Sequence, residues 1–535
     1  MKALRLLQCI LLVPIFLFAK DPYPLIEDID VLHYKFELRL NNKTDEITGL
    51  AEIRFRLSNQ QNLLVLDLIN WQDGVGMEVD QVLMDKFPVS FTHMANKLSI
   101  TCPTYSAADT LLELSIHYHG IPKDGLIISQ NKFGKKSFFG DNWPDRARHW
   151  LPCVDHLSDK ATVEFLVKAP SQYQVVANGY KKGFYPAETG FNYTHYESTV
   201  PLPTKVMVIG VGEFAIQTAG FAGQTRIESW VFPENMEAGF LDYSPAVEIV
   251  NYFNSKIGPF AFEKLANVQS KTVYGGMENS GAIFYHENSV SGKNRLHSLL
   301  AHEIAHQWFG DAVTEADWHH IWLSEGFATY LEAVCVSDMI SEADLENKMA
   351  KSRSRVVNYY YRNPKPVIDT TIVNLRRLLS TNSYQKGAWF LHMLRKEIGE
   401  VAFWSGLQEY YSLYKNKSAL TKDFRHCMEG ASGINLQHFF DQWLRQSGHP
   451  VLSLNYDYKL KDNVLIITVL QTQSQYCFKF NLDLEIINES GDESISAQIP
   501  VNAKSSEHRI NLDFRPDRII IDPNVNLLFE EAKLK

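Results

Sequence analysis

The sequence contains no block of lysine and arginine residues, and its formal net charge is −10. Proteins that bind nucleic acids usually present a basic patch or stripe to the phosphates. Hydrophobic residues make up 45% and charged residues 21% of the chain, a composition typical of globular proteins. We therefore expect no nucleic-acid partner. The 535 residues exceed what one hydrophobic core accommodates, so we expect several domains.

Cysteine is scarce: the chain has 6, and no two are close in sequence. This distribution indicates neither a disulfide framework nor a zinc site made of cysteines. Internal repeats and low-complexity linkers are also missing. We therefore expect the domains to pack closely against one another.

The apolar run at residues 6–18 is short for a membrane span. Lys2 and Arg5 precede it, and Ala19 follows as a small residue for cleavage. This is the layout of a secretory signal peptide. We predict that residues 1–19 form such a signal, that the protein is exported to the periplasm or the exterior, and that no stable membrane anchor remains after cleavage. A buried N-terminal helix or an uncleaved anchor is the alternative.

Hydrophobic periodicity divides the rest of the chain into three parts. Apolar and polar residues alternate in 32–40 and 51–57, which predicts antiparallel strands with one buried face and an all-β domain over 20–215. Residues 216–450 show mainly helical periods, and 451–535 alternate again. The predicted fold class is multidomain α+β, with a mostly α-helical middle domain and a small C-terminal β domain. Helices are expected at 236–257, 291–310, 323–339, 386–398 and 434–446.

The segment "HEIAHQWFG" at 302–310 has the spacing of a metal site. On a helix, His302 and His306 lie about 40° apart and one turn along the axis, so both imidazoles can bind one ion. A catalytic zinc site needs a third protein ligand, and Glu325 on the next helical pattern provides it. We predict one Zn²⁺ per chain on these three residues. Glu332, two turns later, either orients a histidine ligand or is a solvated surface residue.

Glu303 lies at the margin of the same helix face, beside the expected position of a zinc-activated water. A carboxylate there can act as a general base and pass the proton to a leaving amine. The expected reaction is amide hydrolysis. Whether an internal or a terminal bond is cleaved is still open at this point.

The segment "YGGMENSGAIF" at 274–284 bears on that choice. Gly275 and Gly276 permit close approach by another chain, and a short strand here on an exposed edge can pair with a peptide. Glu278 would then place its carboxylate beside the α-ammonium group at the end of a bound peptide. Read alone, the segment is more typical of an ordinary glycine turn.

Together, "YGGMEN", "HEIAHQWFG" and "WLSEGFATYLE" resemble the motifs of the M1 family of zinc aminopeptidases, a group of gluzincins. The resemblance covers most of the chain and implies a β-rich first domain, a thermolysin-like catalytic domain and a C-terminal β-sandwich. It also implies that Glu303 is the base, that Glu278 binds the free amine, and that Tyr384 in "SYQKGAWF" stabilises the oxyanion. The positions that match are Gly275, Gly276, Met277, Glu278 and Asn279 for substrate binding and His302, His306 and Glu325 for zinc.

The sequence departs from the family pattern in three places. Trp143 stands nearest to a position where the family often has Gln or Glu in its amine site, although Asp141 or Asp145 can substitute. Ser324 replaces an asparagine next to the third zinc ligand, which should not affect ligation. The sequence ends after the third domain, whereas many members add a helical fourth domain, so we expect a more open cleft unless another subunit covers it.

The resulting hypothesis is a zinc aminopeptidase that removes single residues from peptides with a free N-terminus. A thermolysin-like endopeptidase has the same zinc chemistry but no need of Glu278. Epoxide hydrolysis, as in one branch of the family, is a second hydrolytic role that the motifs allow. A catalytically retired peptide-binding module is the non-enzymatic alternative, and the intact Glu303 and Tyr384 argue against it.

Overall fold

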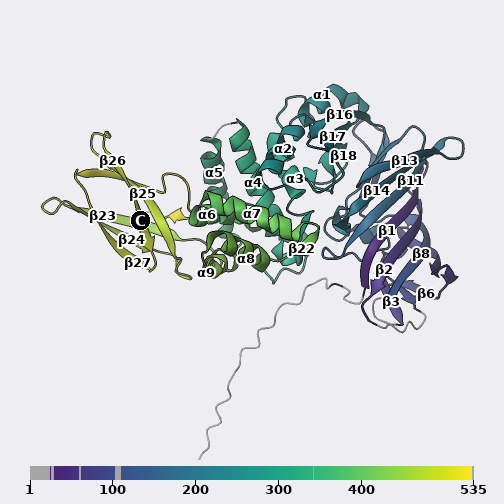
Figure 1. Cartoon of the computed structure of the whole chain (residues 1–535), viewed down its shortest axis with the longest axis horizontal. Helices are drawn as coiled ribbons and strands as arrows, with labels where there is room; N and C mark the ends of the chain where they lie inside the picture. Colours follow the sequence, from purple (N-terminus) through teal and green to yellow (C-terminus); the bar gives the residue numbers. More distant parts are fainter. Residues whose placement is uncertain (1–24, 26–28, 60–61, 103–109, 341–342, 533–535) are drawn as a thin grey trace, which may run out of the picture.

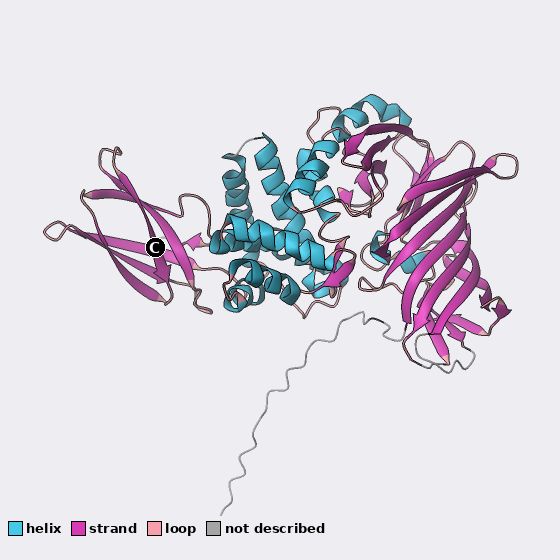
Figure 2. Cartoon of the chain, viewed as in Figure 1, coloured by secondary structure: helices cyan, strands magenta, loops and turns pink. Residues whose placement is uncertain are grey.

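The computed structural model describes residues 25, 29–59, 62–102, 110–340 and 343–532. A β-rich region lies at one end, a mostly helical region in the middle, and a smaller β region with the C-terminus at the other end (Figure 1). The predicted multidomain α+β class is confirmed (Figure 2). The predicted signal peptide, residues 1–19, lies outside the described residues.

The largest sheet of the N-terminal region has eight strands. β1 and β2 pair antiparallel and bury alternate side chains such as Tyr34, Phe36 and Leu38, as their alternation predicts. The sheet is not wholly antiparallel, because β1 also pairs with β11 in parallel. In sheet order the strands are β13 Tyr180–Pro186, β14 Phe191–Pro203, β11 Lys160–Pro170, β1 Ile29–Arg39, β2 Ile47–Leu57, β8 Thr110–Ile121, β4 Gly76–Met84 and β5 Phe87–Pro88.

Two smaller sheets complete the N-terminal region. One contains β3 Leu63–Asp67, β7 Lys97–Thr101 and β6 Phe91–Met94. The other contains β12 Gln174–Ala177, β15 Ile209–Gly212, β10 Lys136–Gly140 and β9 Leu126–Gln130. Single turns of 3-10 helix follow β10 and β14, at η1 Ala147–His149 and η2 Thr204–Val206. The second sheet borders the middle region, since Phe139 of β10 packs against Phe284 in that region.

The middle region begins with a five-stranded sheet in the order β16 Ala215–Ala222, β17 Thr225–Val231, β18 Lys264–Ser270, β20 Ala282–His286 and β19 Gly276–Met277. The three inner strands are parallel, and β16 and β19 pair antiparallel at the two edges. The glycine-rich segment therefore forms a short edge strand, as its sequence predicts.

Nine α-helices are described, and they form most of the middle region. They are α1 Met236–Tyr243, α2 Ala246–Lys256, α3 His297–His306, α4 Trp322–Ile340, α5 Ala343–Tyr360, α6 Gly387–Ile398, α7 Glu400–Tyr414, α8 Thr421–Ser432 and α9 Gln437–Phe440. Single 3-10 turns occur at η3 Pro233–Asn235, η4 Trp318–His320 and η5 Leu375–Leu378, π-turns at η6 Asn382–Lys386 and η7 Asp441–Arg445, and a short parallel strand pair at β21 Val313–Glu315 and β22 Lys417–Ala419.

Several helix boundaries differ from the sequence-based expectation. The helix expected at 236–257 is two helices, because Pro245 has no N–H to continue the first. The helix expected at 291–310 begins only at α3, because the Asp242 carboxylate accepts the backbone N–H groups of Ser291, Gly292 and Asn294 and holds this stretch as a loop. The expected 434–446 helix is the short α9 followed by a π-turn. Helices α5, α7 and α8 were not expected.

The C-terminal region is built from two sheets. One has the order β27 Ser505–Asn511, β24 Val464–Gln471, β23 Val451–Lys459 and β29 Glu530–Glu531, and the other β26 Ser494–Val501, β25 Phe480–Asn488 and β28 Pro516–Ile521. Strands β24 and β25 each bury alternate side chains, such as Leu465 and Ile467 on one and Leu482 and Leu484 on the other. This pattern gives a small sandwich with one apolar core.

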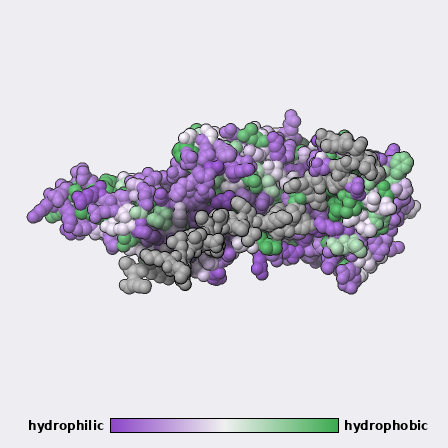
Figure 3. Space-filling view, turned by 90° about the horizontal axis from the view of Figure 1, so that it is seen from below, coloured by the Kyte–Doolittle hydropathy of each residue, from purple (hydrophilic) through white to green (hydrophobic). Residues whose placement is uncertain are grey.

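Within the described ranges, no helix combines the length and the apolar character needed to cross a membrane. On the face seen in Figure 3, hydrophilic residues dominate and hydrophobic residues are scattered in small groups.

Candidate metal centre and substrate cavity

Helices α3 and α4 bring the three predicted metal ligands together. The Glu325 Oε2 atom lies 3.6 Å from His302 Nε2 and 3.4 Å from His306 Nε2. The two Nε2 atoms are 3.3 Å apart. Two imidazole nitrogens and one carboxylate oxygen thus converge within 4.8 Å of one another. Residues separated by nineteen positions meet because α3 and α4 pack side by side.

The chemistry of these donors fits a zinc ion. Two neutral imidazoles and one carboxylate are a donor set that catalytic zinc sites use, with one position left for water or substrate. The Glu325 Oε2 atom is buried and has no hydrogen-bond donor within normal distance. A buried anionic oxygen without a partner is costly, and a cation between the three side chains would satisfy it.

Ser324 is a residue whose role the sequence did not reveal. Its hydroxyl lies 3.0 Å from Nδ1 of His306, and the Phe309 carbonyl lies 3.3 Å from the same nitrogen. Contacts on Nδ1 fix the orientation of the ring and leave Nε2 free for the metal. The serine that departs from the family pattern therefore supports a zinc ligand.

Glu303 lies on the cavity side of α3, against the edge strand. A Cβ added to Gly276 would approach Glu303 Oε1 to 2.3 Å, so the carboxylate lies directly beside the glycine backbone. Burial raises the pKa of Glu303 to about 7, and the nearby carboxylates of Glu278 and Glu325 add to this effect while the two imidazoles oppose it. A group with a pKa near neutrality is suited to accept and return a proton.

Tyr384 comes from the η6 turn and lies over the metal site. Its ring stacks on the His302 ring, with centroids 6.0 Å apart and planes at 8°. Burial raises the pKa of Tyr384 well above its usual range, and neighbouring carboxylates raise it further. The hydroxyl therefore keeps its proton and remains a hydrogen-bond donor.

The recognition segment, residues 274–281, is tied to the end of α3. The Gln307 amide donates to the Glu278 carbonyl at 2.7 Å, and its oxygen accepts from the Gly281 N–H at 2.8 Å. The carboxylates of Glu278 and Glu303 and an imidazole nitrogen of His306 lie within 4.8 Å of one another. Gln307 follows the second zinc histidine directly, but no spacing rule marked it as a positioning residue.

One predicted substrate-binding residue is placed differently. Asn279 is fully buried, and it does not line the cavity. Its carbonyl accepts the Ala282 N–H in the turn that leads into β20. A contact between Asn279 and the substrate therefore stays a prediction. Glu332 does not line the cavity either, and it pairs with Lys348 at 3.5 Å.

A cavity of about 300 Å³ joins these groups. The described residues that line it are Trp143, Tyr274, Gly275, Gly276, Met277, Glu278, Leu299, His302, Glu303, His306, Glu325, Leu379 and Tyr384. It brings together the predicted metal ligands, base, amine-binding carboxylate and tyrosine, which come from four separate stretches of the sequence.

Comparison with known protein families identifies two matching domains in the chain. Residues 31–206 match the Peptidase M1 N-terminal domain, and residues 243–443, which contain the whole metal site, match the Peptidase family M1 domain. The chain belongs to the M1 peptidase family. His302, His306 and Glu325 accordingly form an M1 zinc site.

Similar M1 proteins come from distant organisms. The chain is 26% identical to a glutamyl aminopeptidase of Homo sapiens over 80% of this chain and 47% of that protein. It is 23% identical to probable aminopeptidase 1 of Saccharolobus solfataricus over 92% and 64%. The chain thus spans about half the length of many curated relatives that it matches. The crystal structure of Legionella pneumophila aminopeptidase A in complex with aspartic acid shares the fold, with a TM-score of 0.82 at 16% identity over 95% of this chain and 60% of that chain.

Neither aspartate considered for a second amine anchor reaches the cavity of this M1 protein. Asp141 is fully buried, where it accepts hydrogen bonds from Thr272 and the Val273 N–H at 3.2 Å each and pairs with Arg146. Asp145 lies 3.8 Å from Arg148 and does not line the cavity. Trp143 occupies the cavity wall here instead.

We expect Glu325→Ala to lose its bound zinc, because two imidazoles alone leave the ion without the only anionic ligand of the site. Metal analysis of the purified variant should fall from about one zinc per chain to a small fraction of that value. Glu332→Ala is the matched control on the same helix and should keep its zinc. Equal zinc content in both variants would exclude Glu325 as a ligand.

Proposed function

We propose that this chain is a zinc aminopeptidase that hydrolyses the first peptide bond of peptides with a free N-terminus. One observation carries the proposal: Glu278 lies in the same cavity as Glu303 and the metal ligands, within 4.8 Å of both Glu303 and His306. A carboxylate at that distance fixes the peptide's end only one residue away from the reacting bond.

The substrate's amino terminus is held by charge and by strand pairing. The α-ammonium group of a peptide has a pKa near 8 and is mostly cationic at neutral pH, which suits the Glu278 carboxylate. The edge strand β19 offers backbone groups to an extended peptide in the lane that ends at Glu278. These two contacts place the first peptide bond beside Glu303.

The chemical step uses two further residues. Glu303 accepts a proton from the attacking water and returns it to the departing amine. Tyr384 donates its O–H to the oxygen on which negative charge develops. Zinc, when bound by the three ligands, lowers the pKa of water and polarises the carbonyl group.

Glu303→Gln tests the base. The amide keeps the shape of the side chain but accepts no proton, so we expect kcat to fall by about 10²–10⁴-fold. Zinc content and melting temperature should match the wild type, because Glu303 is not among the three ligands. Hydrolysis of a fluorogenic aminoacyl substrate measures the effect. Wild-type kcat in this variant would exclude Glu303 as the base.

Glu278→Gln tests the amine-binding role. Losing a charge-assisted hydrogen bond should lower kcat/KM for free-amine substrates by about 10–100-fold, with a higher KM. The measurement compares each aminoacyl substrate with its N-acetylated form. The wild type should strongly prefer the free amine and the variant should prefer it much less. An endopeptidase would cleave both forms equally, and a retired binding module would cleave neither.

We propose further that the protein is exported. The basic residues and the short apolar run within residues 1–19 support this. Expression of the full chain in its own host, followed by fractionation and N-terminal mass spectrometry, should find the protein outside the cytoplasm and starting near residue 20. A cytoplasmic protein that retains Met1 would contradict export.

A further inference from the structure

The cavity walls divide into an acidic part and an apolar part. Three carboxylates, those of Glu278, Glu303 and Glu325, gather at the metal and amine end. The remaining walls are aromatic or aliphatic and are formed by Trp143, Tyr274, Met277, Leu299 and Leu379. No lysine or arginine is among the described residues that line the cavity.

Trp143 closes the apolar part against two aromatic neighbours. Its ring centroid lies 6.0 Å from that of Tyr274 and 6.0 Å from that of Trp318, both in edge-to-face geometry. The Trp143 residue is 2% exposed, so its packing is tight. Its indole therefore presents a fixed apolar surface to a substrate side chain.

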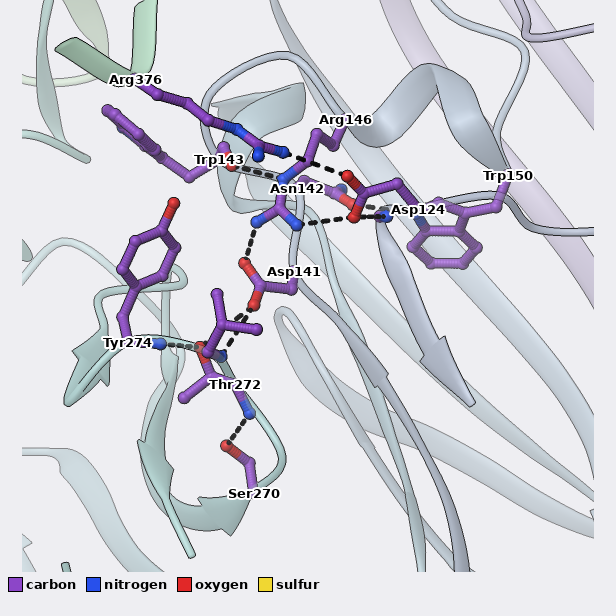
Figure 4. A network of polar contacts seen from close by, with 12 residues as sticks. Asp124, Asp141, Asn142, Trp143, Arg146, Trp150, Ser270, Thr272, Tyr274 and Arg376 are labelled. Atoms are coloured by element: carbon purple, nitrogen blue, oxygen red, sulfur yellow. Dashed lines mark hydrogen bonds and ion pairs between the residues drawn. The ribbon is translucent and has the colours of Figure 1, made fainter. Parts of the chain in front are cut away.

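Arg146, a buried cation behind this wall, is fully occupied (Figure 4). Its Nη1 lies 2.7 Å from Asp124, its Nη2 pairs with Asp141, and its Nε donates to the Trp143 carbonyl at 2.7 Å. The Arg146 side chain is only 6% exposed. Each edge of this cation is thus directed at a partner inside the protein.

Arg376 of η5 extends toward the same network beside Trp143 (Figure 4), and its side chain is 61% exposed. Its Nη2 lies 3.1 Å from the second oxygen of Asp124. The two arginines and the two aspartates balance in charge. The network therefore adds no net formal charge behind the apolar wall.

We infer that the cavity selects a first residue with an uncharged, apolar side chain and discriminates against glutamate and aspartate, with Trp143 and Leu379 forming the selective walls. The inference rests on the proposed function. A substrate side-chain carboxylate would lose water and find no lysine or arginine on the cavity wall to pair with. An apolar side chain would gain from leaving water against the indole.

Isosteric substrate pairs test the inference with the wild-type zinc enzyme. We expect kcat/KM for a glutaminyl substrate to exceed that for the glutamyl substrate by about 100-fold, since the pair differs in charge but hardly in shape. A methionyl substrate should exceed the glutaminyl one by about 10-fold or more. Equal or greater kcat/KM for the glutamyl substrate would overturn the inference.

A lysine introduced into the cavity wall tests whether this wall faces the first side chain of the substrate. Leu379→Lys should reduce the glutaminyl-to-glutamyl ratio at least about 10-fold, because a lysine there offers the missing partner. Val373→Lys adds the same charge at a side chain that is 75% exposed and outside the cavity, so its ratio and its activity should equal those of the wild type. An unchanged ratio in Leu379→Lys, with its melting temperature retained, would show that this wall does not face the first side chain.

The two proposals fail in different ways. Cleavage of no free-amine substrate in the panel would end the proposed function. Cleavage of free-amine substrates with preference for the glutamyl one would keep that function and end the inference on specificity.

Discussion

The site depends on one contact, the meeting of the Glu325 carboxylate with the imidazoles of His302 and His306. Helices α3 and α4 must pack side by side for this contact to form. The same helix α4 also approaches the turn that carries Tyr384, since a Cβ on Gly326 would lie 3.0 Å from the backbone of Gly387. Two glycines at this crossing let Tyr384 lie over the zinc ligands. The metal ligands and the tyrosine proposed to stabilise the oxyanion therefore depend on one packing arrangement.

The recognition segment is held from three directions. Gln307 fixes it to the end of the zinc helix. Asn178 of the N-terminal region donates to the Ser280 carbonyl at 2.8 Å. Asp141 of the same region accepts hydrogen bonds from Thr272 and Val273, which directly precede the segment. The N-terminal region is therefore part of the active site's support. The position of Glu278 relative to the zinc depends on contacts between regions far apart in the sequence.

The acidic groups and the apolar groups of the site occupy separate parts of the cavity. The acidic groups gather where a metal ion and an ammonium group would neutralise them. Arg146 and Arg376, near the apolar wall, pair with Asp124 and Asp141 of the protein itself. A cavity built in this way is anionic at one end and apolar at the other, which matches a substrate with a cationic terminus and an apolar side chain. Burial and the neighbouring carboxylates also raise the pKa of Glu303, because both disfavour its charged form.

The sequence alone determined the features that depend on local periodicity. Fixed helical geometry relates His302, Glu303 and His306, so their spacing predicts their common face. Alternation predicted the faces of β1 and β2, and glycines predicted the edge strand before Glu278. Pro245 also marks a helix break in the sequence, since proline cannot continue a helix. The apolar period nevertheless predicts one helix over 236–257, because it extends on both sides of Pro245.

Only the tertiary structure decided which residues far apart in the sequence support these locally determined features. The parallel pairing of β1 with β11, the contact of Ser324 with His306 and the hydrogen bonds of Asn178 join positions whose local sequence carries no sign of the partner. The same holds for Arg146, which is buried and pairs with Asp124 and Asp141. Periodicity reports contacts within one element, whereas contacts between elements depend on how those elements pack.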